Sequence, residues 1–130
     1  MAVELNHTIV RAHDKKASAE FLATILGLDV GTPMGPFIPV AASNGVTLDF
    51  ADSNEPFAPE HYAFLVSEAE FDAIFERIQR NGIAYYADPT RNAPGQINHR
   101  DGGRGAYFED PNGHILEILT RPYGSGPVDE

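Results

Sequence analysis

Alternation between apolar and polar positions predicts strands along much of the chain. Side chains two positions apart share a face of a strand, so a period of two marks a strand with one buried side. Turn residues separate these runs, and Ser43-Asn44-Gly45 and Asp110-Pro111-Asn112-Gly113 favour tight hairpins because Asn and Gly tolerate positive φ. The predicted strands cover residues 3–12, 37–42, 46–51, 60–66, 83–87, 106–109 and 115–119.

In two segments the apolar residues instead recur every three to four positions, as in a helix. Asp14 is a candidate N-cap for a helix over about residues 15–26, and Gly27 supplies its end. Ser67 and Glu70 have the spacing of a capping box for a second helix, which ends at Asn81-Gly82. Each helix keeps one apolar face, made of Ala17, Phe21, Leu22 and Ile25 in the first and of Phe71, Ile74, Phe75 and Ile78 in the second.

The order of elements repeats on either side of a polar linker at residues 52–59. Superposing the two halves brings His7 onto His61 and Asp49 onto Glu117. Each half thus places a His in its first strand and a carboxylate in its last strand. These side chains fall on the strand faces opposite to those that the helices would cover, so we expect them to line one shared cavity.

Glu117 lies among large apolar residues of its strand. A carboxylate in such a place is costly unless it is paired, hydrogen-bonded or bound to a metal. Two His and a carboxylate suit a divalent metal such as Fe, Mn, Ni, Co or Zn, and this set with open positions suits ferrous oxygen chemistry. The residue types predict a metal site, with a metal-free cavity or a hydrogen-bonded polar core as the alternatives.

Composition restricts the partners and the setting. The chain has 130 residues, which suits a single domain, and its net charge of −10 disfavours nucleic acid and anionic membranes. The apolar runs are too short to span a membrane. The N-terminal residues follow a strand pattern and show no targeting signal, so we expect a cytoplasmic protein. Because it contains no Cys, disulfides and thiolate sites are excluded.

Several motifs resemble the vicinal oxygen chelate superfamily, which includes glyoxalase I, extradiol dioxygenases, fosfomycin-resistance enzymes and bleomycin-binding proteins. They are Asn6-His7-Thr8-Ile9-Val10, Leu26-Gly27-Leu28, Glu60-His61-Tyr62-Ala63-Phe64 and Asp110-Pro111-Asn112-Gly113-His114-Ile115-Leu116-Glu117. The resemblance implies an α+β fold in which two βαβββ modules form an open, mostly antiparallel barrel around a metal cavity. The modules would span about residues 1–54 and 60–122 of one domain, 1–130, and residues 123–130 would be a tail.

Within this superfamily, the resemblance leaves two enzyme readings open. Glyoxalase I uses all four repeated positions as ligands, here His7, Asp49, His61 and Glu117, with Arg11 at a position that holds the glutathione carboxylate. Asp49 replaces a Glu, and the loss of one methylene shortens its reach. The metal of this isomerase would be Ni²⁺ or Zn²⁺.

The first choice is an extradiol-type dioxygenase with Fe²⁺ held by His7, His61 and Glu117. By resemblance to the dioxygenase signature, His99 would be the acid/base and Tyr107 a hydrogen-bond donor to the substrate. The small-molecule substrate would chelate the metal through two neighbouring oxygens. The loop of residues 88–103 would be a lid that carries His99, because it is rich in Pro, Gly and Asn and has no apolar periodicity.

Two further readings receive less support from the sequence. A fosfomycin enzyme would need a Thr where Ile9 stands and a potassium-binding loop where residues 101–105 stand. A metal-free bleomycin-binding protein fits the acidic charge but needs none of the His and Glu ligands. For the enzyme we expect a homodimer, because two modules leave open sheet edges, and such a dimer could build each site from two chains.

Overall fold

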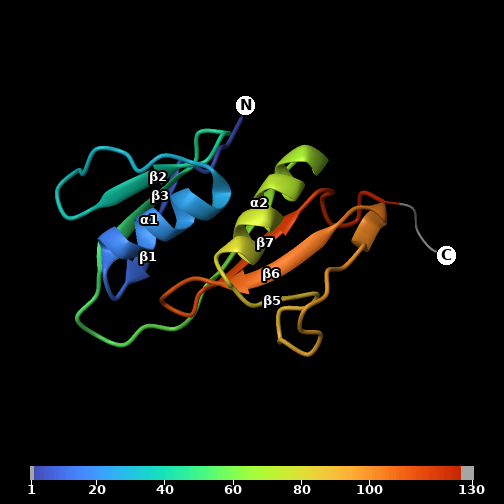
Figure 1. The fold of residues 1–130 in the computed structure, drawn as a ribbon. Helices are drawn as coiled ribbons and strands as arrows, with labels where there is room; N and C mark the ends of the chain where they lie inside the picture. The colour runs from blue at the N-terminus through green and yellow to red at the C-terminus, as the bar shows by residue number, and fades with distance from the viewer. Residues whose placement is uncertain (1, 127–130) are drawn as a thin grey trace. The chain divides into compact units, whose positions relative to one another are not determined.

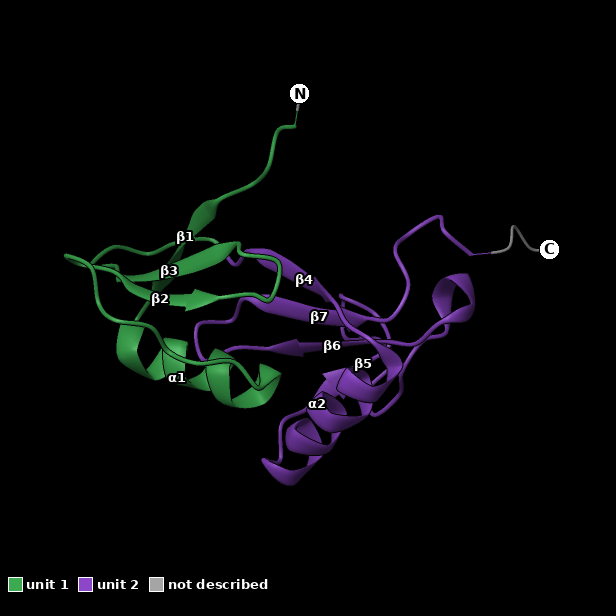
Figure 2. Cartoon of the chain, turned by 90° about the horizontal axis from the view of Figure 1, so that it is seen from above, with its two compact units in different colours: residues 1–58 green, residues 59–130 purple. Residues whose placement is uncertain are grey.

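The computed structural model describes residues 2–126, and the chain divides into two compact units, residues 1–58 and 59–130 (Figure 1). Figure 2 shows the two units in separate colours, each with one long helix and its own sheet. The order strand, helix, strands that the sequence predicts is therefore present in both units.

The first unit has a three-stranded sheet with strand order β1-β3-β2. Strand β1 runs parallel to β3, and β2 pairs antiparallel with β3. Helix α1 begins where the predicted N-cap, Asp14, accepts hydrogen bonds from two backbone N–H groups, and it ends at Gly27 with φ 75°. The elements are β1 (His7–Ala12), α1 (Lys15–Leu26), β2 (Ile38–Ala41) and β3 (Thr47–Asp52).

The second unit has a four-stranded sheet with strand order β4-β7-β6-β5. Helix α2 begins at the predicted cap, where Ser67 accepts a hydrogen bond from the backbone of Glu70. Phe75 of this helix packs edge-on against Tyr85 at 4.8 Å between ring centroids. The elements are β4 (His61–Leu65), α2 (Glu68–Arg80), β5 (Tyr85–Tyr86), the 3₁₀-helix η1 (Arg100–Gly102), β6 (Gly105–Glu109) and β7 (Ile115–Leu119).

One face of each sheet forms the apolar core, and it is the face predicted from alternation. Strand faces opposite to the His positions are buried in both units. His7, Ile9 and Arg11 are by contrast exposed along β1. The buried residues on these faces include Val10, Ala12, Val40, Leu48 and Phe50 in the first unit and Ala106, Phe108, Leu116 and Ile118 in the second.

Two predicted strands are shorter in the structure. β1 begins at His7 rather than at residue 3, because its partner β3 begins at Thr47 and offers no earlier residue to pair with. β5 is limited to two residues rather than 83–87, since the chain then turns into the loop that follows. Both sheets are mixed: β1 with β3 and β4 with β7 are parallel, and the other pairings described are antiparallel. Among residues 2–126 no helix is long and apolar enough to cross a membrane.

Candidate metal centre

The two units place a His and a carboxylate at equivalent points of their sheets. In the first unit His7 stands beside Thr47, and two pairs further along Ile9 stands beside Asp49. In the second unit His61 stands beside Ile115, and two pairs further along Ala63 stands beside Glu117. The equivalence expected from the repeat is therefore present in the registers of both sheets, and in each unit the two side chains share one face.

In the second unit, His61 and Glu117 are in direct contact. The Nε2 atom of His61 lies 3.0 Å from Oε1 of Glu117, whose side chain is only 1% exposed. The other ring nitrogen of His61, Nδ1, lies 3.1 Å from the backbone oxygen of Ile115. The carbonyl oxygen and an ionised Glu117 carboxylate both only accept, so a single ring proton can serve one of these two contacts and a doubly protonated ring serves both.

A neutral ring with its proton on Nδ1 would turn the lone pair of His61 Nε2 toward Oε1 of Glu117. Two electron-rich atoms at hydrogen-bond distance require a cation between them or beside them, either a second ring proton or a metal ion. An Nδ1–H bound to a backbone carbonyl is also the arrangement that orients a metal-ligating His and fixes Nε2 as the ligand atom. The donor set of this pair therefore fits a divalent metal.

The second oxygen of Glu117 belongs to a chain of hydroxyl groups. Its Oε2 atom accepts a hydrogen bond of 2.6 Å from the hydroxyl of Tyr123. The Tyr123 hydroxyl lies 3.0 Å from the hydroxyl of Tyr107, which in turn accepts a hydrogen bond of 2.5 Å from Nη1 of Arg100. Because an ionised carboxylate only accepts and a guanidinium only donates, the protons point one way, from Arg100 through Tyr107 and Tyr123 to Glu117.

These contacts bear on the chemistry of the site. Desolvation of the hydroxyl, and then its hydrogen bonds to Glu117 and Tyr107, raise the pKa of Tyr123, so it remains a proton donor to the carboxylate at neutral pH. Tyr107 is 4% exposed and its ring stacks beside that of His61 at 5.9 Å between centroids. The predicted catalytic Tyr107 thus lies directly beside two of the predicted ligands.

The first unit carries its own candidate ligands, His7 and Asp49, on the exposed face of β1 and β3. His7 is exposed, and its Nδ1 lies 2.8 Å from the side-chain oxygen of Asn6. Asp49 is half-buried on the same face, and Arg11 is exposed further along β1. Over residues 2–126, no group of three or more His, Cys, Asp or Glu side chains is placed to hold a metal ion.

The loop of residues 88–103 is held by hydrogen bonds within itself and to strand β6 of the second sheet. The Asp88 carboxylate accepts hydrogen bonds of 3.0 and 2.7 Å from the backbone N–H groups of Asn92 and Ala93. Asn98 and Gly105 exchange two backbone hydrogen bonds, of 2.8 and 2.9 Å. His99, the predicted acid/base, is exposed just before η1, and its neighbour Arg100 is the loop residue that reaches Tyr107.

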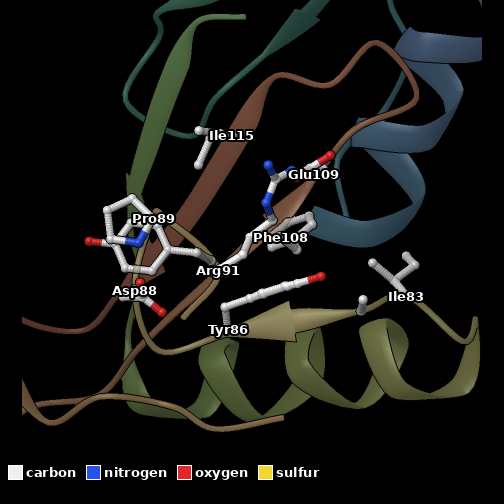
Figure 3. A pocket seen from close by; sticks show the side chains of 10 residues that line it. Ile83, Tyr86, Asp88, Pro89, Arg91, Phe108, Glu109 and Ile115 are labelled. Carbon is white, nitrogen blue, oxygen red and sulfur yellow. Dashed lines mark hydrogen bonds and ion pairs between the residues drawn. The ribbon is translucent and has the colours of Figure 1, made fainter. Parts of the chain in front are cut away.

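A pocket of about 240 Å³ opens in the second unit, and Figure 3 shows the side chains around it. Its wall includes Tyr107, whose register partner on β7 is Glu117, and Ile115, whose register partner on β4 is His61, although neither His61 nor Glu117 lines the pocket itself. Most of the wall is apolar or aromatic. Charge is supplied by Asp88 and by the ion pair of Arg91 with Glu109. The loop after β5 thus forms part of the wall.

Three residues important to this region have no role in the sequence-based interpretation. Tyr123 lies in the segment assigned to the tail, and Arg100 is one of several charged residues in an irregular loop. His114 is fully buried, and its Nδ1 accepts a hydrogen bond of 2.9 Å from the backbone of Glu60, which fixes the start of β4. The sequence around a single Tyr or Arg outside a periodic segment does not indicate its hydrogen-bond partner. Only the tertiary structure therefore identifies these roles.

Comparisons with known proteins agree on one family. Residues 4–118 match the model of the Glyoxalase/Bleomycin resistance protein/Dioxygenase superfamily. The solved structure of Oxidase ChaP-H2 is 69% identical, with a TM-score of 0.95, and the match covers 97% of this chain and 99% of that one. The solved structure of Oxidase ChaP-H1 is 59% identical, with a TM-score of 0.92, and the match covers 95% of this chain and 99% of that one. Glutathione transferase FosA of Serratia marcescens is 26% identical over 91% of this chain and 81% of its own. The chain therefore belongs to the glyoxalase, bleomycin resistance and dioxygenase superfamily.

Proposed function

We propose that the protein is a divalent-metal-dependent oxidoreductase that uses Fe²⁺ and dioxygen on a small substrate with two neighbouring oxygen atoms. The observation that carries this proposal is the His61–Glu117 pair, because Nε2 of His61 and a buried carboxylate oxygen lie 3.0 Å apart and both are ligand atoms that suit a divalent metal. Together with His7, this pair gives the set of two His and one carboxylate that suits ferrous oxygen chemistry.

Oxidation is favoured over the other reactions of the superfamily by the similar proteins and by the ligand set. The two solved relatives named oxidases are 69% and 59% identical, whereas the relative named a glutathione transferase is 26% identical. Ile9 also stands where a fosfomycin enzyme would have its substrate-binding Thr. Asp49, shorter than the Glu of a glyoxalase, makes a four-ligand site a poorer fit. Cleavage of an aromatic diol, as in extradiol dioxygenases, is the first choice within this class.

The residues around the pair suggest how the site would work. His7, His61 and Glu117 would hold the metal, which when bound supplies Lewis-acid activation of the chelating substrate and, as Fe²⁺, electrons for dioxygen. Tyr107 carries a hydroxyl proton at the edge of the pocket, and Arg100 donates to the oxygen on which negative charge would develop if that proton moved to the substrate. The apolar pocket wall would exclude water.

The reaction class can be tested with the metal-reconstituted protein. Loaded with Fe²⁺ without oxygen and then exposed to it, the protein should consume oxygen in the presence of aromatic vicinal diols. The same sample should not isomerise the glutathione adduct of methylglyoxal and should not add thiols to fosfomycin. Isomerisation at a rate above that of oxygen uptake would refute the proposal and favour the glyoxalase reading.

Asp49 separates the two ligand sets. In the proposed three-ligand site it forms part of the cavity wall, so Asp49→Asn should leave metal affinity within a few-fold of the unchanged protein. The substitution keeps the shape of the side chain, removes its charge and replaces one accepting oxygen with a donating NH2 group. Metal titration of both proteins measures the difference. A loss of stoichiometric metal in Asp49→Asn would make Asp49 a ligand and contradict the dioxygenase assignment.

The third ligand, His7, belongs to the first unit, and we propose that a homodimer completes each site from two chains. The mixed dimer of His7→Ala and His61→Ala would then contain one site with both His residues intact. Refolding an equal mixture should restore metal to about a quarter of the sites, because half of the dimers are mixed and each has one intact site. Metal analysis of the separate variants is the control. If the mixture binds no more metal than they do, each site is built within one chain.

A further inference from the structure

The segment of residues 121–126 folds back onto η1 through one carboxylate. Asp101 accepts hydrogen bonds from the backbone N–H groups of Gly124, at 3.2 Å, and of Gly126, at 3.3 Å. The approach is close, because a Cβ atom on Gly126 would collide with the backbone of Asp101. Nη2 of Arg121 closes the segment on itself with a hydrogen bond of 3.0 Å to the backbone oxygen of Ser125. This C-terminal segment therefore has a defined place on the second unit.

The consequence of this placement is the position of Tyr123. Its side chain is one of the more exposed large residues, at 58%, so the ring contributes little to the core. Its hydroxyl nevertheless reaches Oε2 of Glu117 at 2.6 Å and the Tyr107 hydroxyl at 3.0 Å. A side chain whose ring is exposed to solvent and whose hydroxyl has two hydrogen-bond partners contributes through its polar end rather than through packing.

The hydroxyl of Tyr123 distinguishes the two oxygens of Glu117. Oε2 accepts from Tyr123, while Oε1 faces Nε2 of His61. A carboxylate that is free to rotate could present either oxygen, or both, to a cation. Hydrogen bonds to the outer oxygen of a ligating carboxylate orient it, and removal of such partners commonly costs metal affinity or activity by 10- to 100-fold.

From this geometry we infer that Tyr123 is a positioning residue of the metal site, delivered by the C-terminal segment. It holds Oε2 of Glu117 so that Oε1 alone is presented beside His61, and it directs the hydroxyl of Tyr107. This inference rests on the proposed metal-binding function. It also extends the site beyond residues 4–118, which the family model covers, to a segment that the sequence pattern leaves as a tail.

The test compares two Tyr→Phe variants that each lose one hydroxyl. Tyr123→Phe removes the hydrogen bond to Glu117, whereas Tyr85→Phe alters a residue that packs on Phe75 of α2, on the other side of the sheet. Metal affinity is measured by competition with a chelating dye, and the coordination is followed by the visible spectrum of the Co²⁺-loaded proteins. Tyr123→Phe should weaken metal binding by roughly 10- to 100-fold and change the Co²⁺ spectrum, while Tyr85→Phe should match the unchanged protein.

A second variant separates the segment from the hydroxyl. Asp101 has φ 56°, so Asp101→Gly removes the carboxylate that holds the segment without adding backbone strain. It should weaken metal binding in the same direction as Tyr123→Phe, although Tyr123 itself is intact. Unchanged affinity and spectrum in Tyr123→Phe, with metal bound to the unchanged protein, would overturn the inference and leave the proposed function standing. Failure of the unchanged protein to bind any divalent metal would refute both.

Discussion

Replacing His61 with Ala is expected to abolish stoichiometric metal binding. His61 supplies the ring nitrogen that faces the buried carboxylate of Glu117, and its other ring nitrogen, Nδ1, lies 3.1 Å from the backbone oxygen of Ile115. Ala removes that donor and leaves Glu117 with the hydrogen bond from Tyr123 alone. A single carboxylate oxygen and one remaining His cannot hold a borderline divalent ion as tightly as three donors do. Metal analysis after purification without chelators measures the loss.

His99→Ala is the matched control for this experiment. It also removes an imidazole, but His99 is exposed in the loop before η1 and is predicted to be a catalytic group rather than a ligand. Its metal content should equal that of the unchanged protein. Thermal unfolding of both variants shows whether either substitution disturbs the fold. Full metal retention in His61→Ala would remove the basis of the proposed site.

Replacing Tyr107 with Phe is expected to lower substrate turnover by roughly 10²-fold or more, which is the usual contribution of general acid–base catalysis. Metal content should remain unchanged, because the Tyr107 hydroxyl contacts Tyr123 and Arg100 rather than a predicted ligand. Phe retains the buried ring beside His61, so the pocket wall and the fold should persist. Steady-state oxygen uptake with the accepted substrate measures the effect on kcat.

The companion variant for turnover is His99→Ala, since the dioxygenase resemblance gives the acid/base role to that residue. A comparable loss in both variants would mean that the loop brings His99 to the substrate during the reaction. Normal turnover in His99→Ala together with a large loss in Tyr107→Phe would assign proton transfer to Tyr107 and Arg100. Normal turnover in Tyr107→Phe would contradict the role given to the hydrogen-bonded chain.

The helices and hairpins could be predicted from the sequence because their signals are local. Asp14 and Gly27 bound the first helix at the residues expected, and Gly45 adopts φ 89° in the first hairpin turn. Register follows from the same patterns, because a shift by one residue would turn the apolar face of a strand to solvent. The pairing of Tyr107 with Glu117 in the second hairpin is one result.

Features that depend on distant partners could not be predicted. His114 has the wrong parity for the site face, and its burial follows from a hydrogen bond with Glu60, 54 residues away. The start of β1 depends on where its partner β3 begins, and the end of β5 depends on where the chain turns into the following loop. Tyr123 lies outside both repeated modules, so its contact with Glu117 leaves no trace in the alternation of apolar and polar residues.

The most direct test of the proposed site is anomalous X-ray diffraction at the iron edge from crystals of the protein loaded with Fe²⁺ without oxygen. The account predicts one iron peak per site, bonded to Nε2 of His61, to Oε1 of Glu117 and to Nε2 of His7, with Oε2 of Glu117 still bonded to the hydroxyl of Tyr123. Crystals that bind iron at none of these atoms, or a peak held by other residues, would contradict it.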